Sequence, residues 1–218
     1  MAKSKTKIAY LCSACGDDFA KWNGQCPSCK EWGTLSEFKV STKKSGRRYE
    51  PRETKSLTDV LTSDSGIRIS TGLKEADRVF GGGLLSGSLI LLGGSPGVGK
   101  STLALQICSG INRKALYISA EESEEQVALR AQRLKVKPEN LFLSGENELD
   151  GIIAHIERIK PELVVIDSIQ TVMNSGLDSL PGSPSQIRDC GQRLLEVSKQ
   201  KNVSILIVGH VTKDGAIA

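Results

Sequence analysis

Long apolar runs are missing from this sequence of 218 residues, the longest being about four or five residues. A helix that crosses a membrane needs roughly 18 consecutive apolar residues, and the basic start of the chain lacks the apolar segment of a secretion signal. We therefore expect a cytoplasmic protein with no membrane partner. Aromatic residues are also scarce, at 4%, but an apolar content of 39% is enough to bury a core.

A strong net charge is absent too: the sequence has 29 Lys and Arg and 25 Asp and Glu, which gives a net charge of +4. The excess lies near the N-terminus: residues 1–56 carry 12 basic and 6 acidic side chains, whereas residues 57–218 carry 17 and 19. Residues 39–56 alone hold seven basic and two acidic side chains and almost no apolar ones, so burial cannot offset their ordering entropy. We expect an exposed basic linker at 39–56, between domains at 1–38 and 57–218.

Cysteines are few and unevenly spaced. Four of the six form two CxxC pairs, Cys12 with Cys15 and Cys26 with Cys29. Disulfides are disfavoured in a chain without an export signal, because cytosolic thiols are kept reduced. Two CxxC turns instead direct four thiolates at one tetrahedral metal ion. We expect Zn²⁺, with iron as the alternative, since thiolates alone do not choose between the two.

The expected role of this metal is structural. Some 30 residues bury too little surface to fold alone, whereas zinc supplies about 10 to 16 kcal/mol in small finger peptides. Four cysteines also leave no open coordination position for catalysis. Zinc and four thiolates together add −2 to the balance of +1 in residues 1–38, which disfavours DNA binding by this finger. We expect a positioning or docking module in which Trp22 and Trp32 cover the metal, with base stacking as their alternative role.

A phosphate-binding loop is the second strong motif. It fits GxxxxGK[ST] between a strand-like stretch at 88–92 and a helix-compatible one at 102–107. Its glycines let backbone N–H groups surround a phosphate at a helix N-terminus. Lys100 is expected to contact the β- and γ-phosphates of ATP, and Ser101 to bind Mg²⁺. The predicted nucleotide-binding residues are Gly94, Ser95, Pro96, Gly97, Val98, Gly99, Lys100, Ser101 and Thr102.

Acids follow two other predicted strands. Leu163–Asp167 reads as a buried parallel strand that ends in Asp167, a candidate Mg²⁺ ligand at the edge where such sheets bind ligands. Ala115–Ser119 runs into Glu121 and Glu122, and an acid there would polarise the attacking water. Capping of the next helix is the alternative role for Glu121, because acids favour first turns.

The rest of residues 57–218 alternates helix and strand, as expected for an α/β protein with a doubly wound, mainly parallel sheet. After the last predicted strand come Gly209-His210-Val211-Thr212-Lys213, at the same edge as the acids, and a polar residue there could sense the γ-phosphate. Cys108 and Cys190 lie in predicted helices and are expected to be small core residues.

These motifs together resemble the RadA/Sms family of bacterial DNA repair and recombination proteins, which are RecA-like ATPases. The resemblance rests on both CxxC pairs with Trp22 and Trp32, the run from Ser70-Thr71-Gly72 to Asp77, the triplet Gly81-Gly82-Gly83, the phosphate loop, and Tyr117-Ile-Ser-Ala-Glu121-Glu122-Ser123. It implies a RecA-like P-loop core with a zinc-ribbon-like N-terminal module. It also implies that Glu121 is the catalytic glutamate, acting with Lys100.

The resemblance further implies a DNA-stimulated ATPase that drives branch migration of recombination intermediates on single-stranded DNA, as a homo-hexamer and with the RecA recombinase as partner. An ATP-switched scaffold that docks partners through its finger is the alternative. The family continues with a Lys-Asn-Arg-Phe-Gly motif and a Lon-protease-like domain, so we expect this ATPase domain to be incomplete at its C-terminal end. DNA contacts are expected in the basic linker, in residues 171–184 and at Lys213.

Overall fold

The computed structural model describes residues 6–41, 54, 56–62, 68–137, 139–177 and 179–210. The chain forms two compact units that divide near residue 65. The first contains the four-cysteine finger and the second contains the phosphate loop. Most of the expected basic linker lies outside the described residues, so the predicted boundaries at 38 and 56 remain predictions.

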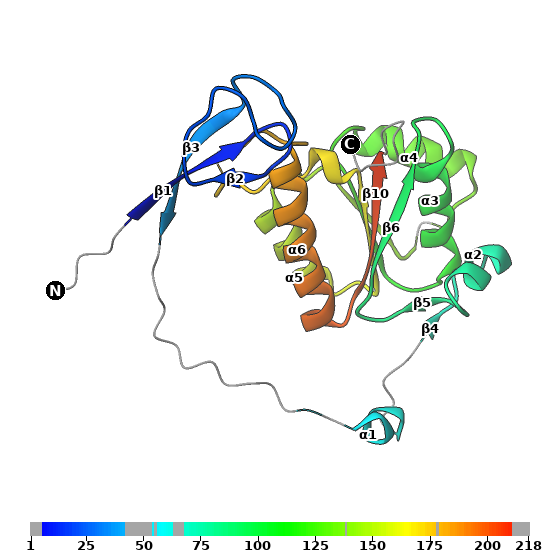
Figure 1. The fold of residues 1–218 in the computed structure, drawn as a ribbon. Helices are drawn as coiled ribbons and strands as arrows, with labels where there is room; N and C mark the ends of the chain where they lie inside the picture. The colour runs from blue at the N-terminus through cyan, green and yellow to red at the C-terminus, as the bar shows by residue number, and fades with distance from the viewer. Residues whose placement is uncertain are drawn as a thin grey trace. The chain divides into compact units, whose positions relative to one another are not determined.

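The finger is a small antiparallel sheet with the strand order β2-β1-β3 (Figure 1). Strand β1 (Thr6–Cys12) pairs with β2 (Asp18–Phe19) and with β3 (Leu35–Ser41). Its core is the four cysteines together with Tyr10, Phe19 and Leu35.

The two tryptophans of the finger do not belong to this core. Trp22 is 60% exposed and Trp32 is 73% exposed, and both lie beside Gly24. The expectation that they cover the metal is therefore wrong. Tyr10, Phe19 and Leu35, one from each of the three strands, pack against the cysteines instead.

The second unit is built on a five-stranded parallel sheet. Its strands, in spatial order, are β6 (Leu89–Gly94), β10 (Ser204–His210), β9 (Leu163–Asp167), β7 (Ala115–Ser119) and β8 (Leu141–Ser144). Since all five run the same way, their carboxyl ends meet at one edge, where ligands bind in open α/β sheets. The predicted α/β class with a parallel sheet and a separate four-cysteine module is confirmed.

Helices cover both faces of this sheet (Figure 1). Helices α5 (Leu149–Ile159) and α6 (Pro184–Lys201) share one core with alternate strand residues such as Val164. Helices α3 (Lys100–Gly110) and α4 (Glu124–Arg133) share the other core with the strand residues that point to the opposite face, such as Val165. Strand residues are thus apolar on both faces, which is typical of buried parallel sheets. Cys108 and Cys190 are buried in these two cores, as expected.

Short elements complete the described structure. They are α1 (Leu57–Thr62), β4 (Arg68–Ile69), α2 (Lys74–Val79), β5 (Leu84–Leu85) and the 3₁₀ turn η1 (Ile169–Thr171), with β4 and β5 pairing antiparallel. No helix among the described residues combines the length and the apolar character that a membrane crossing needs.

The run from Ser70 to Asp77 clasps the end of α3. Asp77 Oδ1 accepts hydrogen bonds from the backbone N–H and the hydroxyl of Thr71, both at 2.7 Å. This holds the Thr71 carbonyl against Gly110, where an added Cβ would lie 1.8 Å from the carbonyl oxygen. Part of the family-like motif therefore serves packing, because only glycine permits so close a backbone approach.

Candidate functional sites

The four cysteines of the finger converge on one point. Their Sγ atoms all lie within 4.8 Å of one another, with Cys12 and Cys29 at 3.7 Å and Cys15 and Cys26 at 3.6 Å. A tetrahedral zinc ion with Zn–S bonds of about 2.3 Å separates its sulfurs by about 3.8 Å. The donor set therefore fits a single Zn²⁺ ion.

Tight turns place these sulfurs. Gly16 N–H donates to the Cys12 carbonyl at 2.8 Å, and Lys30 N–H donates to the Cys26 carbonyl at 3.0 Å. Gly16 and Lys30 both adopt positive φ angles, of 75° and 64°. Each CxxC thus closes on itself, which brings its two side chains to the same side of the turn.

The cysteine environments differ. Burial disfavours the Cys12 thiolate, but hydrogen bonds from the Thr34 hydroxyl and from the backbone of Cys15 and Ala14 outweigh it and lower the pKa of Cys12 to about 6. Burial raises the pKa of Cys15 to about 12. The charge of a bound divalent ion is what favours the thiolate form of all four ligands.

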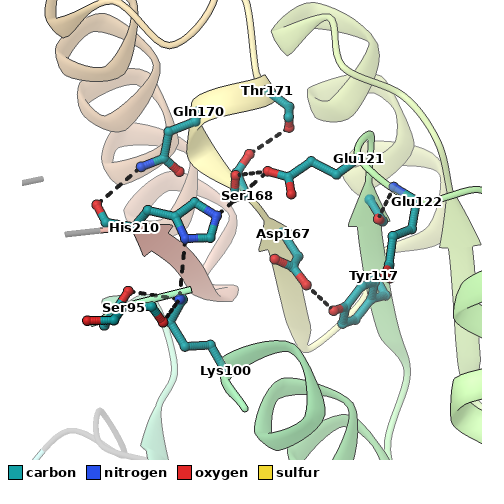
Figure 2. A network of polar contacts seen from close by, with 12 residues as sticks. Ser95, Lys100, Tyr117, Glu121, Glu122, Asp167, Ser168, Gln170, Thr171 and His210 are labelled. Atoms are coloured by element: carbon teal, nitrogen blue, oxygen red, sulfur yellow. Dashed lines mark hydrogen bonds and ion pairs between the residues drawn. The ribbon is translucent and has the colours of Figure 1, made fainter. Parts of the chain in front are cut away.

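The phosphate loop connects β6 to α3. Gly97 and Gly99 have φ angles of 79° and 96°, the left-handed region that glycine enters without steric cost. Lys100 is only 7% exposed, and its Nζ donates to the carbonyls of Gly94 at 2.8 Å and Ser95 at 2.9 Å (Figure 2). These bonds offset the cost of burying the ammonium group and fix where it points.

A pocket of about 320 Å³ opens beside this loop, a volume near the lower end for small-ligand sites. Its lining combines loop and helix residues with side chains from three strand ends and from α4. The lining residues are Gly97, Gly99, Lys100, Ser101, Thr102, Glu121, Arg130, Arg133, Asp167 and His210. Among the predicted nucleotide-binding residues, Gly94 and Ser95 instead contact Lys100, and Val98 is 64% exposed.

The two acids of the pocket are held by hydroxyl groups from each other's strands (Figure 2). Tyr117 of β7 donates to Asp167 Oδ2 at 2.5 Å, and Ser168, which follows β9, donates to Glu121 Oε1 at 2.5 Å. Burial raises the pKa of the Tyr117 hydroxyl well above its usual range, and the charge of Asp167 raises it further, so the phenol remains a donor.

Glu121 and Glu122 face different partners. Glu122 forms an ion pair with Arg130 of α4, whereas Glu121 contacts Ser168 and lies 3.9 Å from His210 Nε2. Helix α4 is capped by Ser123, whose hydroxyl accepts from the Gln126 N–H at 3.4 Å in a capping box. The alternative in which Glu121 caps this helix is therefore wrong.

His210 lies between the cation and the acid of the site. Its Nδ1 is 3.4 Å from Lys100 Nζ, and its Nε2 is on the side of Glu121 (Figure 2). The end of β10 thus places a polar side chain where the sequence predicts one. A role in sensing the γ-phosphate stays a prediction.

Four residues of the site were not predicted, namely Tyr117, Arg130, Arg133 and Ser168. Arg130 and Arg133 are three positions apart on one helix, a spacing that places them on the same face. This spacing does not say which face meets the phosphate loop. The bonds of Tyr117 and Ser168 cross between strands that are more than 40 residues apart in sequence, so they depend on strand order.

The predicted DNA-contacting segments are only partly described. Asn174, near the start of residues 171–184, donates from its side chain to Asp189 at 2.8 Å, and its backbone N–H donates to Gln186 at 2.9 Å. Helix α6 thus anchors this segment, while Leu180 is 79% exposed. Lys213 and the linker residues Lys43, Lys44, Arg47 and Arg48 lie outside the described residues.

A loop of the form GxxxxGK[ST] between a strand and a helix, with carboxylates from neighbouring parallel strands, defines a P-loop nucleotide-binding protein. A model of the AAA domain matches residues 51–216, and the chain belongs to this family. A model of the rubredoxin metal binding domain matches residues 10–37, the finger.

Several bacterial relatives match nearly the whole chain. The DNA repair protein RadA of Listeria monocytogenes is 45% identical over 100% of this chain and 49% of its own length. The RadA proteins of Bacillus subtilis and Aquifex aeolicus are 42% and 44% identical over 99% and 98% of the chain. The predicted resemblance to the N-terminal and ATPase portion of RadA is confirmed. The chain spans about half the length of these relatives.

Proposed function

We propose that this chain binds ATP with Mg²⁺ and hydrolyses it, as the ATPase part of a DNA repair and recombination protein. The observation that carries the proposal is the convergence of Lys100, Glu121 and Asp167 on one pocket beside the phosphate loop. Similarity to proteins named DNA repair protein RadA supports the cellular role.

The residues divide the work of phosphoryl transfer. The loop amides and Lys100 bind the phosphates, which positions the γ-phosphate for attack. Ser101 and Asp167 offer hydroxyl and carboxylate oxygens, the ligands that Mg²⁺ prefers. Magnesium held there offsets the charge of the phosphates. Glu121 orients and polarises the attacking water, and Ser168 fixes the Glu121 carboxylate through the bond at 2.5 Å.

The finer role follows from the family resemblance. In this role, single-stranded DNA stimulates ATP hydrolysis, and hydrolysis drives branch migration at branched recombination intermediates. The chain acts as a homo-hexameric ring, with RecA as its partner. Leu180 is 79% exposed and lies in the connection that leaves the sheet at Asp167, the end of β9, which supports a link between DNA contact and the nucleotide site.

The test is ATP turnover with and without a single-stranded oligonucleotide. We expect turnover that rises on addition of DNA, because a motor couples its two ligands. Turnover that DNA leaves unchanged would contradict the motor, and the absence of ATP binding would contradict the nucleotide site itself.

The alternative function is an ATP-switched scaffold that docks a partner through the finger. The observation that favours it is the exposure of Trp22 and Trp32, both beside Gly24, since aromatic side chains are enriched at interfaces. Stable ATP binding without turnover, together with loss of partner binding in Trp32→Ala, would favour the scaffold over the motor.

A further inference from the structure

Tyr117 has a role that packing does not explain. Among the described residues it is the bulkiest of the fully buried side chains, with 1% exposure, and its ring belongs to the core cluster shared with Ala104 and Cys108 of α3. A phenylalanine would fill the same space without a polar atom. A buried hydroxyl needs a hydrogen-bond partner, and this one has Asp167 at 2.5 Å.

The direction of this bond is fixed by chemistry. An ionised carboxylate can only accept hydrogen bonds, so the Tyr117 hydroxyl is the donor and Asp167 Oδ2 the acceptor. The bond occupies one carboxylate oxygen and leaves Oδ1 for another partner. We propose that Tyr117 is a positioning residue that orients the Asp167 carboxylate so that Oδ1 serves as the magnesium ligand, an inference that rests on the proposed function.

The backbone makes Tyr117 suited to this task. Tyr117 pairs with Val165 in the parallel register of β7 and β9, two residues before Asp167 on the neighbouring strand. The hydroxyl therefore reaches the end of β9 from a rigid, fully buried ring (Figure 2). A group that donates a hydrogen bond to a metal ligand, without binding the metal itself, orients that ligand and raises metal affinity.

Tyr117→Phe removes only the hydroxyl oxygen. The measurement is the affinity of the 218-residue chain for a methylanthraniloyl-labelled ATP, in EDTA and across a series of Mg²⁺ concentrations. We expect unchanged affinity in EDTA, because the loop and Lys100 remain. We expect the Mg²⁺ concentration that gives half of the gain in affinity to rise about tenfold, the usual effect of removing an outer-shell partner.

Ser204→Ala is the matched control. Ser204 is also fully buried, and its hydroxyl donates to the Leu85 carbonyl at 3.1 Å, at the opposite end of the sheet. This variant should lose stability like Tyr117→Phe but keep the Mg²⁺ requirement of the parent. A parental Mg²⁺ requirement in folded Tyr117→Phe, or an equal rise in both variants, would overturn the positioning role alone. A parent chain that gains no affinity from Mg²⁺ would overturn the proposed function as well.

A second measurement needs no variant at this position. The chain has three tyrosines, Tyr10, Tyr49 and Tyr117, and Tyr10→Phe and Tyr49→Phe assign their ring-¹³C NMR signals. Adding Mg²⁺ to the ATP-bound parent should shift the Tyr117 signal and leave the other two in place. A Tyr117 signal that does not respond to Mg²⁺ would refute the proposal.

Discussion

Single hydroxyl groups fix both acids of the nucleotide site. Carboxylates at strand ends can rotate. The hydrogen bonds from Tyr117 and Ser168, each 2.5 Å long, restrict that rotation. A donor on one strand thus positions the acid of the other, which separates the role of Asp167 from that of Glu121. This arrangement gives each of the two acids in the pocket its own hydrogen-bond donor.

Lys100→Ala tests the phosphate contact. We expect ATP affinity to fall at least about tenfold, because the loss of a charge-assisted hydrogen bond costs roughly 1.5 to 3 kcal/mol. Binding of a fluorescent ATP analogue measures this effect. Lys199→Ala, on the exposed surface of α6, is the control and should bind like the parent. Equal affinity in all three proteins would show that Lys100 does not reach the phosphates.

Glu121→Gln tests the catalytic assignment. The variant should keep ATP bound while turnover falls by about two orders of magnitude or more, the usual contribution of a positioned base. Glu122→Gln is the matched comparison, and it should retain most of the turnover because Glu122 is directed at Arg130. Turnover measured with radiolabelled ATP separates the two. If Glu122→Gln were the inactive variant, the roles of the two glutamates would be reversed.

At the scale of elements, parts of the site follow from sequence and parts do not. Parallel strands end at a common edge, so Asp167 and one acid of the Glu121-Glu122 pair could be placed beside the phosphate loop from their strands alone. The choice of Glu121 over Glu122 needed the family resemblance. The face of α4 that lines the pocket could not be predicted in this way, because the spacing of residues along a helix is compatible with several orientations. Arg130 was missed for this reason. Trp22 and Trp32 were misplaced because a module with so small a core cannot bury every apolar side chain.

The clasp between Thr71 and α3 gives a prediction about stability. Gly110→Ala would set a Cβ 1.8 Å from the Thr71 carbonyl oxygen, a backbone atom that cannot swing away. We expect a loss of about 1 to 3 kcal/mol in the free energy of unfolding, the usual cost of overpacking. Urea denaturation followed by circular dichroism provides the measurement.

Gly191→Ala in α6 is the control for this prediction. An added Cβ at Gly191 meets no atom within 4 Å, so alanine should stabilise the helix by about 0.5 to 1 kcal/mol. Opposite signs for the two substitutions are expected. A Gly110→Ala protein as stable as the parent would contradict the close approach.

At the scale of the whole molecule, the two units are predicted to be energetically separate. Elemental analysis after dialysis should find one zinc ion per chain, and iron, revealed by a visible absorption band, would contradict this.

Cys12→Ser should unfold the finger, since the metal provides most of its folding energy. Nucleotide binding should survive in that variant, because the phosphate loop belongs to the other unit.

The charge distribution gives a prediction about DNA. With zinc bound, the finger is near −1, residues 39–56 are +5 and residues 57–218 are −2. Single-stranded DNA affinity falls with salt by a logarithmic slope of roughly 0.7 per neutralised phosphate. The seven basic linker residues therefore account for a slope of about 5 at most.

Four linker residues, Lys43, Lys44, Arg47 and Arg48, can be neutralised together. Their loss should flatten the salt slope by up to about 3 units while nucleotide affinity stays at the parental value. Fluorescence anisotropy of a labelled oligonucleotide across a salt series gives the slope. An unchanged slope would exclude the linker and leave the segment anchored by Asn174, together with Lys213, as the expected DNA contacts. A flattened slope with intact DNA-stimulated turnover would instead separate DNA capture by the linker from DNA sensing at the nucleotide site.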